Sequence, residues 1–131
     1  MRAGKRLILL VDDDPDDIEL LDEAFASCTP APEIQTAHSG KQALDILMNW
    51  PHTPLPDLIV LDYNMPDMTG AEVLGMLKHD QRFTSTVKVV WSTSDASLYE
   101  QICKENGATH FFKKPDRIEA IHLLAAKLLK L

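Results

Sequence analysis

The chain has 131 residues, 45% of them hydrophobic and 25% charged, which are the proportions of an ordinary globular domain with one core. Its net charge of −7 and its lack of a basic run argue against nonspecific nucleic-acid binding, which needs a basic face. No segment approaches the roughly 18 apolar residues of a membrane span. The apolar run at 7–11 is too short for the core of a signal peptide, so we expect a soluble, cytoplasmic protein.

Strand and helix signals alternate along the chain, beginning with a strand at 6–11. Asp14-Pro15 then opens a helix, because aspartate caps helices and proline is tolerated at the first helical position. Apolar residues three and four apart give this helix one buried stripe, formed by Ile18, Leu21, Phe25 and Cys28. The acidic residues that follow the cap, Asp16 and Asp17, are expected to be solvated in the first turn.

The remaining elements continue the same alternation. Further strands are expected at 33–38, 57–61, 87–91 and 109–113. Further helices are expected to begin at Ser39-Gly40, to carry Val73, Leu74 and Leu77, and to cover 97–106 and 117–131. Cys28 and Cys103 fall in separate predicted helices and form no CxxC pair, so two reduced thiols are expected.

Five strands alternating with five helices predict an α/β fold, a doubly wound parallel sheet with helices on both faces. Ligands bind outside the carboxyl ends of such strands. Three of the predicted strands are followed directly by charged residues, at Asp12-Asp13-Asp14, at Asp62 and at Lys114-Pro115. We expect these endings to meet in one pocket, where a cation would relieve the repulsion between carboxylates. The pattern indicates a hard-metal site beside a carboxylate that can take a phosphoryl group.

Four blocks, in order, resemble the receiver domain of two-component response regulators. They are ILLVDD at 8–13, LIVLDYNMPDMTG at 58–70, VVWST at 89–93 and the segment from 107 to 115 that ends in Lys114-Pro115. The resemblance implies one stand-alone receiver domain over 1–131, with a flavodoxin-like five-stranded sheet in the order 2-1-3-4-5. It implies a phosphorylation switch rather than an enzyme, although the domain catalyses its own phosphotransfer and autodephosphorylation.

The resemblance also implies an acceptor and a metal site. Asp62 matches the phosphoacceptor, whose carboxylate attacks a phosphorus carried on a kinase histidine. Asp12, Asp13, Asp62 and the backbone carbonyl of Asn64 match the ligands of Mg²⁺, a cation that favours oxygen donors and phosphate. Positioning and charge neutralisation are most of what phosphoryl transfer requires.

Three further positions match family roles. Lys114, which directly precedes Pro115, matches the lysine that pairs with the acceptor and then with the phosphoryl group. Ser92 matches the switch hydroxyl, in place of the commoner threonine, and Phe111 the aromatic switch residue. Lys113 is a second lysine next to Lys114 and could be assigned the same role. Because side chains alternate along a strand, and because Lys114 directly precedes the proline, we assign the role to Lys114. The resemblance also predicts a cis Lys114–Pro115 bond, which X–Pro bonds permit.

The implied partners are a sensor histidine kinase or histidine phosphotransfer protein and an unknown downstream protein. The last helix is expected to bury a stripe formed by Ile118, Ile121, Ala125 and Leu128. It also carries further leucines, Leu123, Leu124, Leu129 and Leu131, which one face cannot bury. We therefore predict a partner surface, and a possible homodimer, over the fourth helix, the fifth strand and the fifth helix.

Three alternatives remain open. The triplet Asp12-Asp13-Asp14 after a strand resembles the nucleophile motif of haloacid-dehalogenase-like phosphatases, with Asp12 as the acceptor, although Asp16 stands where threonine or valine is expected. Residues 12–23 nearly fit a calcium loop, but its sixth position is Asp17 instead of glycine. The third alternative is a scaffold that keeps the receiver fold without being phosphorylated.

Overall fold

The computed structural model describes residues 6–51, 54–93 and 97–131. Its strands are β1 (Leu7–Val11), β2 (Glu33–Ala37), β3 (Leu58–Asp62), β4 (Val87–Ser92) and β5 (His110–Lys113). Its helices are α1 (Pro15–Ala26), α2 (Gly40–Met48), α3 (Gly70–Leu77), α4 (Ser97–Glu105) and α5 (Ile118–Leu128). The strands form one parallel sheet in the order β2-β1-β3-β4-β5, so the predicted flavodoxin-like, doubly wound fold is confirmed.

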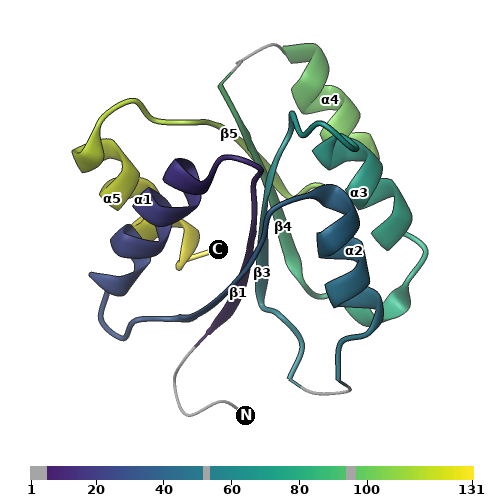
Figure 1. The fold of residues 1–131 in the computed structure, drawn as a ribbon, viewed down its shortest axis with the longest axis horizontal. Coiled ribbons are helices and arrows are strands. Elements are labelled where there is room, and N and C mark those ends of the chain that lie inside the picture. The colour runs from purple at the N-terminus through teal and green to yellow at the C-terminus, as the bar shows by residue number, and fades with distance from the viewer. Residues whose placement is uncertain (1–5, 52–53, 94–96) are drawn as a thin grey trace.

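Helices cover both faces of the sheet: α1 and α5 lie on one face, and α2, α3 and α4 on the other (Figure 1). Successive side chains along a strand point to opposite faces of the sheet, so each central strand contributes side chains to two hydrophobic cores. In β1, Ile8 and Leu10 pack toward α1 and α5, whereas Leu9 and Val11 pack toward the other three helices. This double burial explains the continuous apolar runs in the sequence. Within the described residues, every helix is too short or too polar to cross a membrane.

The first helix buries most of the predicted stripe. Ile18, Leu21 and Phe25 are buried, but α1 ends at Ala26, so Cys28 lies beyond the helix and is only half-buried. The Cys28 amide instead donates to the Phe25 carbonyl oxygen at 3.0 Å, which closes a tighter final turn. The prediction that Cys28 lies inside a helix is therefore wrong.

The last helix is rotated relative to the predicted stripe. Ile121, Ala125 and Leu128 are buried as expected, but Leu124 is the fourth buried residue, and Ile118 is 63% exposed at the start of the helix. Two of the other extra leucines pack in part against the same core, Leu129 and Leu131. Only Leu123, 72% exposed, faces outward, so the premise that the extra leucines cannot be buried is wrong for Leu124 and holds only in part for Leu129 and Leu131.

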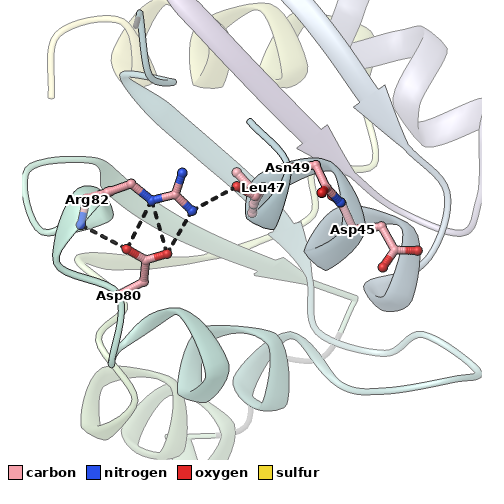
Figure 2. A network of polar contacts seen from close by, with 5 residues as sticks. All are labelled: Asp45, Leu47, Asn49, Asp80 and Arg82. Atoms are coloured by element: carbon pink, nitrogen blue, oxygen red, sulfur yellow. Dashed lines mark hydrogen bonds and ion pairs between the residues drawn. The ribbon is translucent and has the colours of Figure 1, made fainter. Parts of the chain in front are cut away.

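A 3₁₀-helix at Gln81–Phe83, absent from the sequence prediction, connects α3 to β4. Asp80 caps it and pairs with Arg82 at 2.9 Å, and Arg82 Nη2 donates to the Leu47 carbonyl oxygen at 3.3 Å (Figure 2). This Arg82 clamp joins the end of α2 to the 3₁₀-helix that precedes β4. Next to it, the buried Lys88 ammonium donates to the carbonyl oxygens of Phe83 and Thr86, which satisfies a charge inside an apolar strand.

The loop between β3 and α3 is closed by its own hydrogen bonds. Thr69 and Glu72 form a reciprocal capping box at the start of α3. Asp67 accepts bonds from the backbone amides of Gly40 and Lys41, which ties the loop to α2. The Gly70 amide donates to the Tyr63 carbonyl oxygen at 2.8 Å.

Helices α3 and α4, which lie on the same face of the sheet, differ in how deeply they are packed. In α3, five residues are buried: Gly70, Ala71, Val73, Leu74 and Leu77. In α4, Cys103 alone is fully buried, while Tyr99 and Ile102 pack against the core in part. Thus α3 is part of the core, whereas α4 rests on its surface.

Gly70→Ala is expected to destabilise the fold, because a Cβ at position 70 would lie 2.7 Å from the carbonyl oxygen of Asp62. Relieving that overlap requires a backbone shift, which costs about 1–3 kcal/mol. Urea unfolding measures this loss. The control is Gly75→Ala on the same helix, where the added Cβ would meet only the Asn106 side chain, at 3.1 Å. Its effect should stay within about 1 kcal/mol of wild type, and equal losses at both positions would contradict the prediction.

Candidate functional site

The carboxyl ends of β1, β3 and β5 meet at one edge of the sheet. Asp12 directly follows β1, Asp62 is the last residue of β3, and Lys114 directly follows β5. Asp12 and Asp62 are 1% and 4% exposed. Backbone bonds hold two of these endings: the Asp12 amide donates to the Ala37 carbonyl oxygen, and the Lys114 amide donates to the Ser92 carbonyl oxygen. The structure therefore brings the charged strand endings together.

Three carboxylates form the negative part of the site. Asp12, Asp13 and Asp62 each offer an oxygen, and these oxygens lie within 4.8 Å of one another. Asp13 is exposed, so the group opens to solvent on one side. Asp12 Oδ2 is buried, and its contact with Lys114 is an ion pair without hydrogen-bond alignment, which leaves acceptor capacity on that oxygen. Several oxygen donors beside open solvent fit Mg²⁺, which keeps waters and binds few carboxylates.

The Lys114 ammonium contacts carboxylates from three segments. Its Nζ lies 2.8 Å from Asp12 Oδ2, 2.8 Å from Asp17 Oδ2 and 3.3 Å from Asp62 Oδ1. It also lies 5.0 Å from the centroid of the Trp91 ring, a favourable cation–π geometry. The Lys114 side chain is 9% exposed, so these charges interact with little screening by water.

Burial and repulsion dominate the electrostatics of Asp62, the predicted acceptor. Burial raises the pKa of Asp62 to about 7, and the neighbouring Asp12 charge adds to the rise, while Lys114 opposes it. Burial also raises the pKa of Asp12. Burial lowers the pKa of Lys114, but pairing with Asp12 and Asp17 outweighs this effect and raises it above its usual range. Among the described residues, the charged Lys114 ammonium thus faces several carboxylates, so negative charge exceeds positive charge around it.

The two predicted switch residues occupy neighbouring strands. Ser92 is the last residue of β4 and is fully buried. Phe111 lies in β5 opposite Val90 and packs in part against the core under α2, α3 and α4. Asn64 is exposed in the loop that follows Asp62. The switch roles of Ser92 and Phe111, and the carbonyl of Asn64 as a metal ligand, stay predictions.

Sequence reasoning missed the role of Asp17 in this arrangement. Asp17 was expected to be solvated, but its carboxylate accepts a hydrogen bond from Lys114, 97 positions along the chain. A signal was present, because Asp17 precedes Leu21 by four residues and therefore lies along the inward side of α1. Sequence reasoning also missed the stacking of Tyr63 on Tyr99, with ring centroids 4.4 Å apart, which joins the end of β3 to α4.

The predicted cis Lys114–Pro115 bond is wrong. Among the described residues, the one cis peptide bond is Thr29–Pro30. With a trans Lys114–Pro115 peptide, the Lys114 ammonium still lies over the Trp91 ring and contacts Asp12 and Asp17.

Comparisons with known proteins agree with this geometry. A probable cyclic di-GMP phosphodiesterase of Vibrio cholerae is 38% identical over 109 residues, which are 82% of this chain and 23% of that protein. The two-component response regulator ORR5 of Oryza sativa subsp. japonica is 30% identical over 129 residues, 98% of this chain and 92% of that protein. The phosphorylated cyanobacterial phytochrome response regulator RcpA superposes with a TM-score of 0.87 at 28% identity, over 97% of this chain and 93% of that chain.

The family model of the response regulator receiver domain matches residues 8–126, nearly the whole chain. The strand order and the acidic cluster at the carboxyl edge of the sheet are consistent with that match. The chain therefore belongs to the response regulator receiver domain family of two-component systems.

Proposed function

We propose that this receiver accepts a phosphoryl group on Asp62, in a Mg²⁺-dependent reaction, from a histidine kinase or a histidine phosphotransfer protein. The observation that carries the proposal is the buried Asp62 carboxylate, which lies with the oxygens of Asp12 and Asp13 inside 4.8 Å and with Lys114 Nζ at 3.3 Å. The similarity to RcpA, whose structure is of a phosphorylated form, supports it.

The proposed step is a displacement at phosphorus. An Asp62 oxygen attacks the phosphorus held on the donor's imidazole, an O–P bond forms, and the N–P bond breaks with its electron pair leaving on nitrogen. Bound Mg²⁺, held by Asp12, Asp13 and Asp62, would neutralise charge on the phosphoryl oxygens. Lys114 remains charged and supplies a second positive partner for those oxygens.

The proposed output is a change in protein-binding surface. Ser92 would donate a hydrogen bond to the phosphoryl group, and Phe111 in the neighbouring strand β5 would then change its position. Together these changes would shift the population between two states of the protein surface. Two strongly exposed apolar side chains lie on α4 and α5, Leu98 and Ile118, and Leu123 lies further along α5. We propose this α4–β5–α5 face as the surface for a downstream protein or a second copy.

The phosphatase alternative places the acceptor at Asp12 instead. In this structure Asp12 Oδ1 accepts a bond from the Asp14 amide at 3.0 Å, and Oδ2 faces Lys114 at 2.8 Å. Asp12 Oδ1 thus carries a backbone hydrogen bond, and Asp12 Oδ2 lies closer to the ammonium than Asp62 Oδ1 does, at 2.8 Å against 3.3 Å, which favours Asp62 as the nucleophile. The scaffold alternative predicts no labelling at either residue.

Labelling with a small phosphodonor such as acetyl phosphate and Mg²⁺ tests the acceptor. We expect mass spectrometry to find one phosphoryl group on wild type and none on Asp62→Asn, because an amide lacks the nucleophilic oxygen. The control Asp45→Asn, at an exposed position on α2, should label as wild type does. Labelling of Asp62→Asn that disappears in Asp12→Asn would support the phosphatase, and an unlabelled wild type would support the scaffold.

Asp62→Asn is also expected to be more stable than wild type at neutral pH without divalent cations. The pKa of Asp62 rises from 3.8 to about 7 in the folded chain, so its contribution to stability is complete below about pH 4 and lost as the pH rises through 7. Asparagine does not titrate, so the advantage of the variant should grow across this window to about 1–3 kcal/mol. Urea unfolding in EDTA measures it.

The corresponding control is again Asp45→Asn, which should show no growing advantage between pH 4 and pH 7. Mg²⁺ should raise the wild-type unfolding temperature more at pH 8 than at pH 5, because protons compete for the same oxygens. Parallel pH profiles for wild type and Asp62→Asn would mean that the folded state does not disfavour the Asp62 charge.

Leu123→Ser tests the proposed homodimer. If α5 forms its contact, beryllofluoride with Mg²⁺ should shift wild type toward dimer in sedimentation velocity, and the substitution should weaken that dimer by about tenfold or more. Met76→Ser, which alters a 60% exposed side chain on α3, is the matched control. A wild type that stays monomeric in both states at tens of micromolar would rule the dimer out.

A further inference from the structure

The ammonium of Lys114 is held by α1 as well as by the proposed acceptor site. Its aligned hydrogen bond goes to Asp17 at 2.8 Å, whereas Asp62 lies farther away at 3.3 Å. Asp17 lies in the first turn of α1, and its side chain is 29% exposed. The arrangement therefore draws the Lys114 ammonium toward α1 and away from Asp62.

Adjacent aspartates in this helix turn have different surroundings. Asp17 faces inward, in line with the buried Leu21. Asp16 is exposed, and its backbone amide donates to the Asp14 side chain. Both residues carry the same charge at the same end of α1, so they differ mainly in the contact with Lys114.

A phosphoryl group on Asp62 would change this balance. It brings three strong acceptor oxygens, whereas the ammonium has three donors and already contacts Asp12 and Asp17 at 2.8 Å. With Asp62 Oδ1 at 3.3 Å, the ammonium already has three carboxylate partners for its three donors, so a contact with a phosphoryl oxygen must replace one of them. The half-exposed Asp17 is the partner that water can most easily solvate after release.

We propose that Asp17 is a positioning residue that holds Lys114 toward α1 in the unphosphorylated protein and releases it when Asp62 carries a phosphoryl group. Asp17 and the phosphoryl group thus compete for one ammonium, and each weakens the other's hold by the same factor. Asp17 therefore sets how readily Lys114 pairs with a phosphoryl group on Asp62. This inference rests on the proposed function.

The test measures the affinity for beryllofluoride, a mimic of a carboxylate-bound phosphoryl group, at saturating Mg²⁺. Trp50→Phe in all proteins leaves Trp91, 3% exposed and 5.0 Å from the Lys114 ammonium, as the single fluorescent tryptophan. Asp17→Asn should bind about three- to tenfold more tightly than the Trp50→Phe parent. Asp16→Asn, the matched charge control, should stay within about twofold, and Asp17→Glu should return toward the parent.

A spectroscopic signature separates positioning from a general effect on folding. Without ligand, Asp17→Asn should change the Trp91 emission because Lys114 moves over the ring, while Asp16→Asn should not. ¹⁵N NMR of the Lys114 ammonium gives the same comparison with Trp50 retained. Affinity in Asp17→Asn that equals Asp16→Asn, or falls below the parent, overturns the inference. A parent that binds no beryllofluoride with Mg²⁺ and is not labelled by acetyl phosphate overturns the proposed function itself.

Discussion

Repulsion between two buried carboxylates is the constraint on which this structure depends. Asp12 and Asp62 are removed from water at the ends of neighbouring strands, and one lysine compensates them only in part. Such a pair is unfavourable by itself, so the rest of the fold must hold it together. The two apolar cores on either side of the sheet do this, because they fix the strand ends whatever charge those ends carry. The same repulsion makes the site favour whatever brings positive charge.

The alternation of side chains along the strands also decides what surrounds each charge. In β4, Trp91 packs on the α1 and α5 side and lies beneath the Lys114 ammonium, whereas Val90 packs toward α2, α3 and α4. Ser92, two residues beyond Val90, belongs to that second side. The lysine and the hydroxyl therefore approach the end of β3 from opposite faces of the sheet. A shift of the β4 register by one residue would turn Ser92 to the face covered by α1 and α5.

The sequence predicts the parts of the structure that local pattern controls. The five strands, their order of appearance and their charged endings follow from short apolar runs and the residues directly after them. Pairs distant in sequence do not follow, and the contact of Asp17 with Lys114 needs both the sheet order and the rotation of α1. Helix rotation likewise decides that Leu124 and not Ile118 is buried, which the 3.6-residue period leaves open when apolar residues crowd several faces.

The helices α3 and α4 are packed unequally, and this difference bears on how a change at Asp62 would spread through the molecule. The loop from Asp62 to α3 is closed by the capping box and by the Gly70 amide, and α3 itself is part of the core, so a disturbance at Asp62 meets high resistance on that route. Toward α4 the resistance is lower, because only Cys103 is deeply buried there, and the stacked rings of Tyr63 and Tyr99 connect the two ends of that route. From Asp62, the more weakly packed route therefore runs through the pair formed by Tyr63 and Tyr99 into α4.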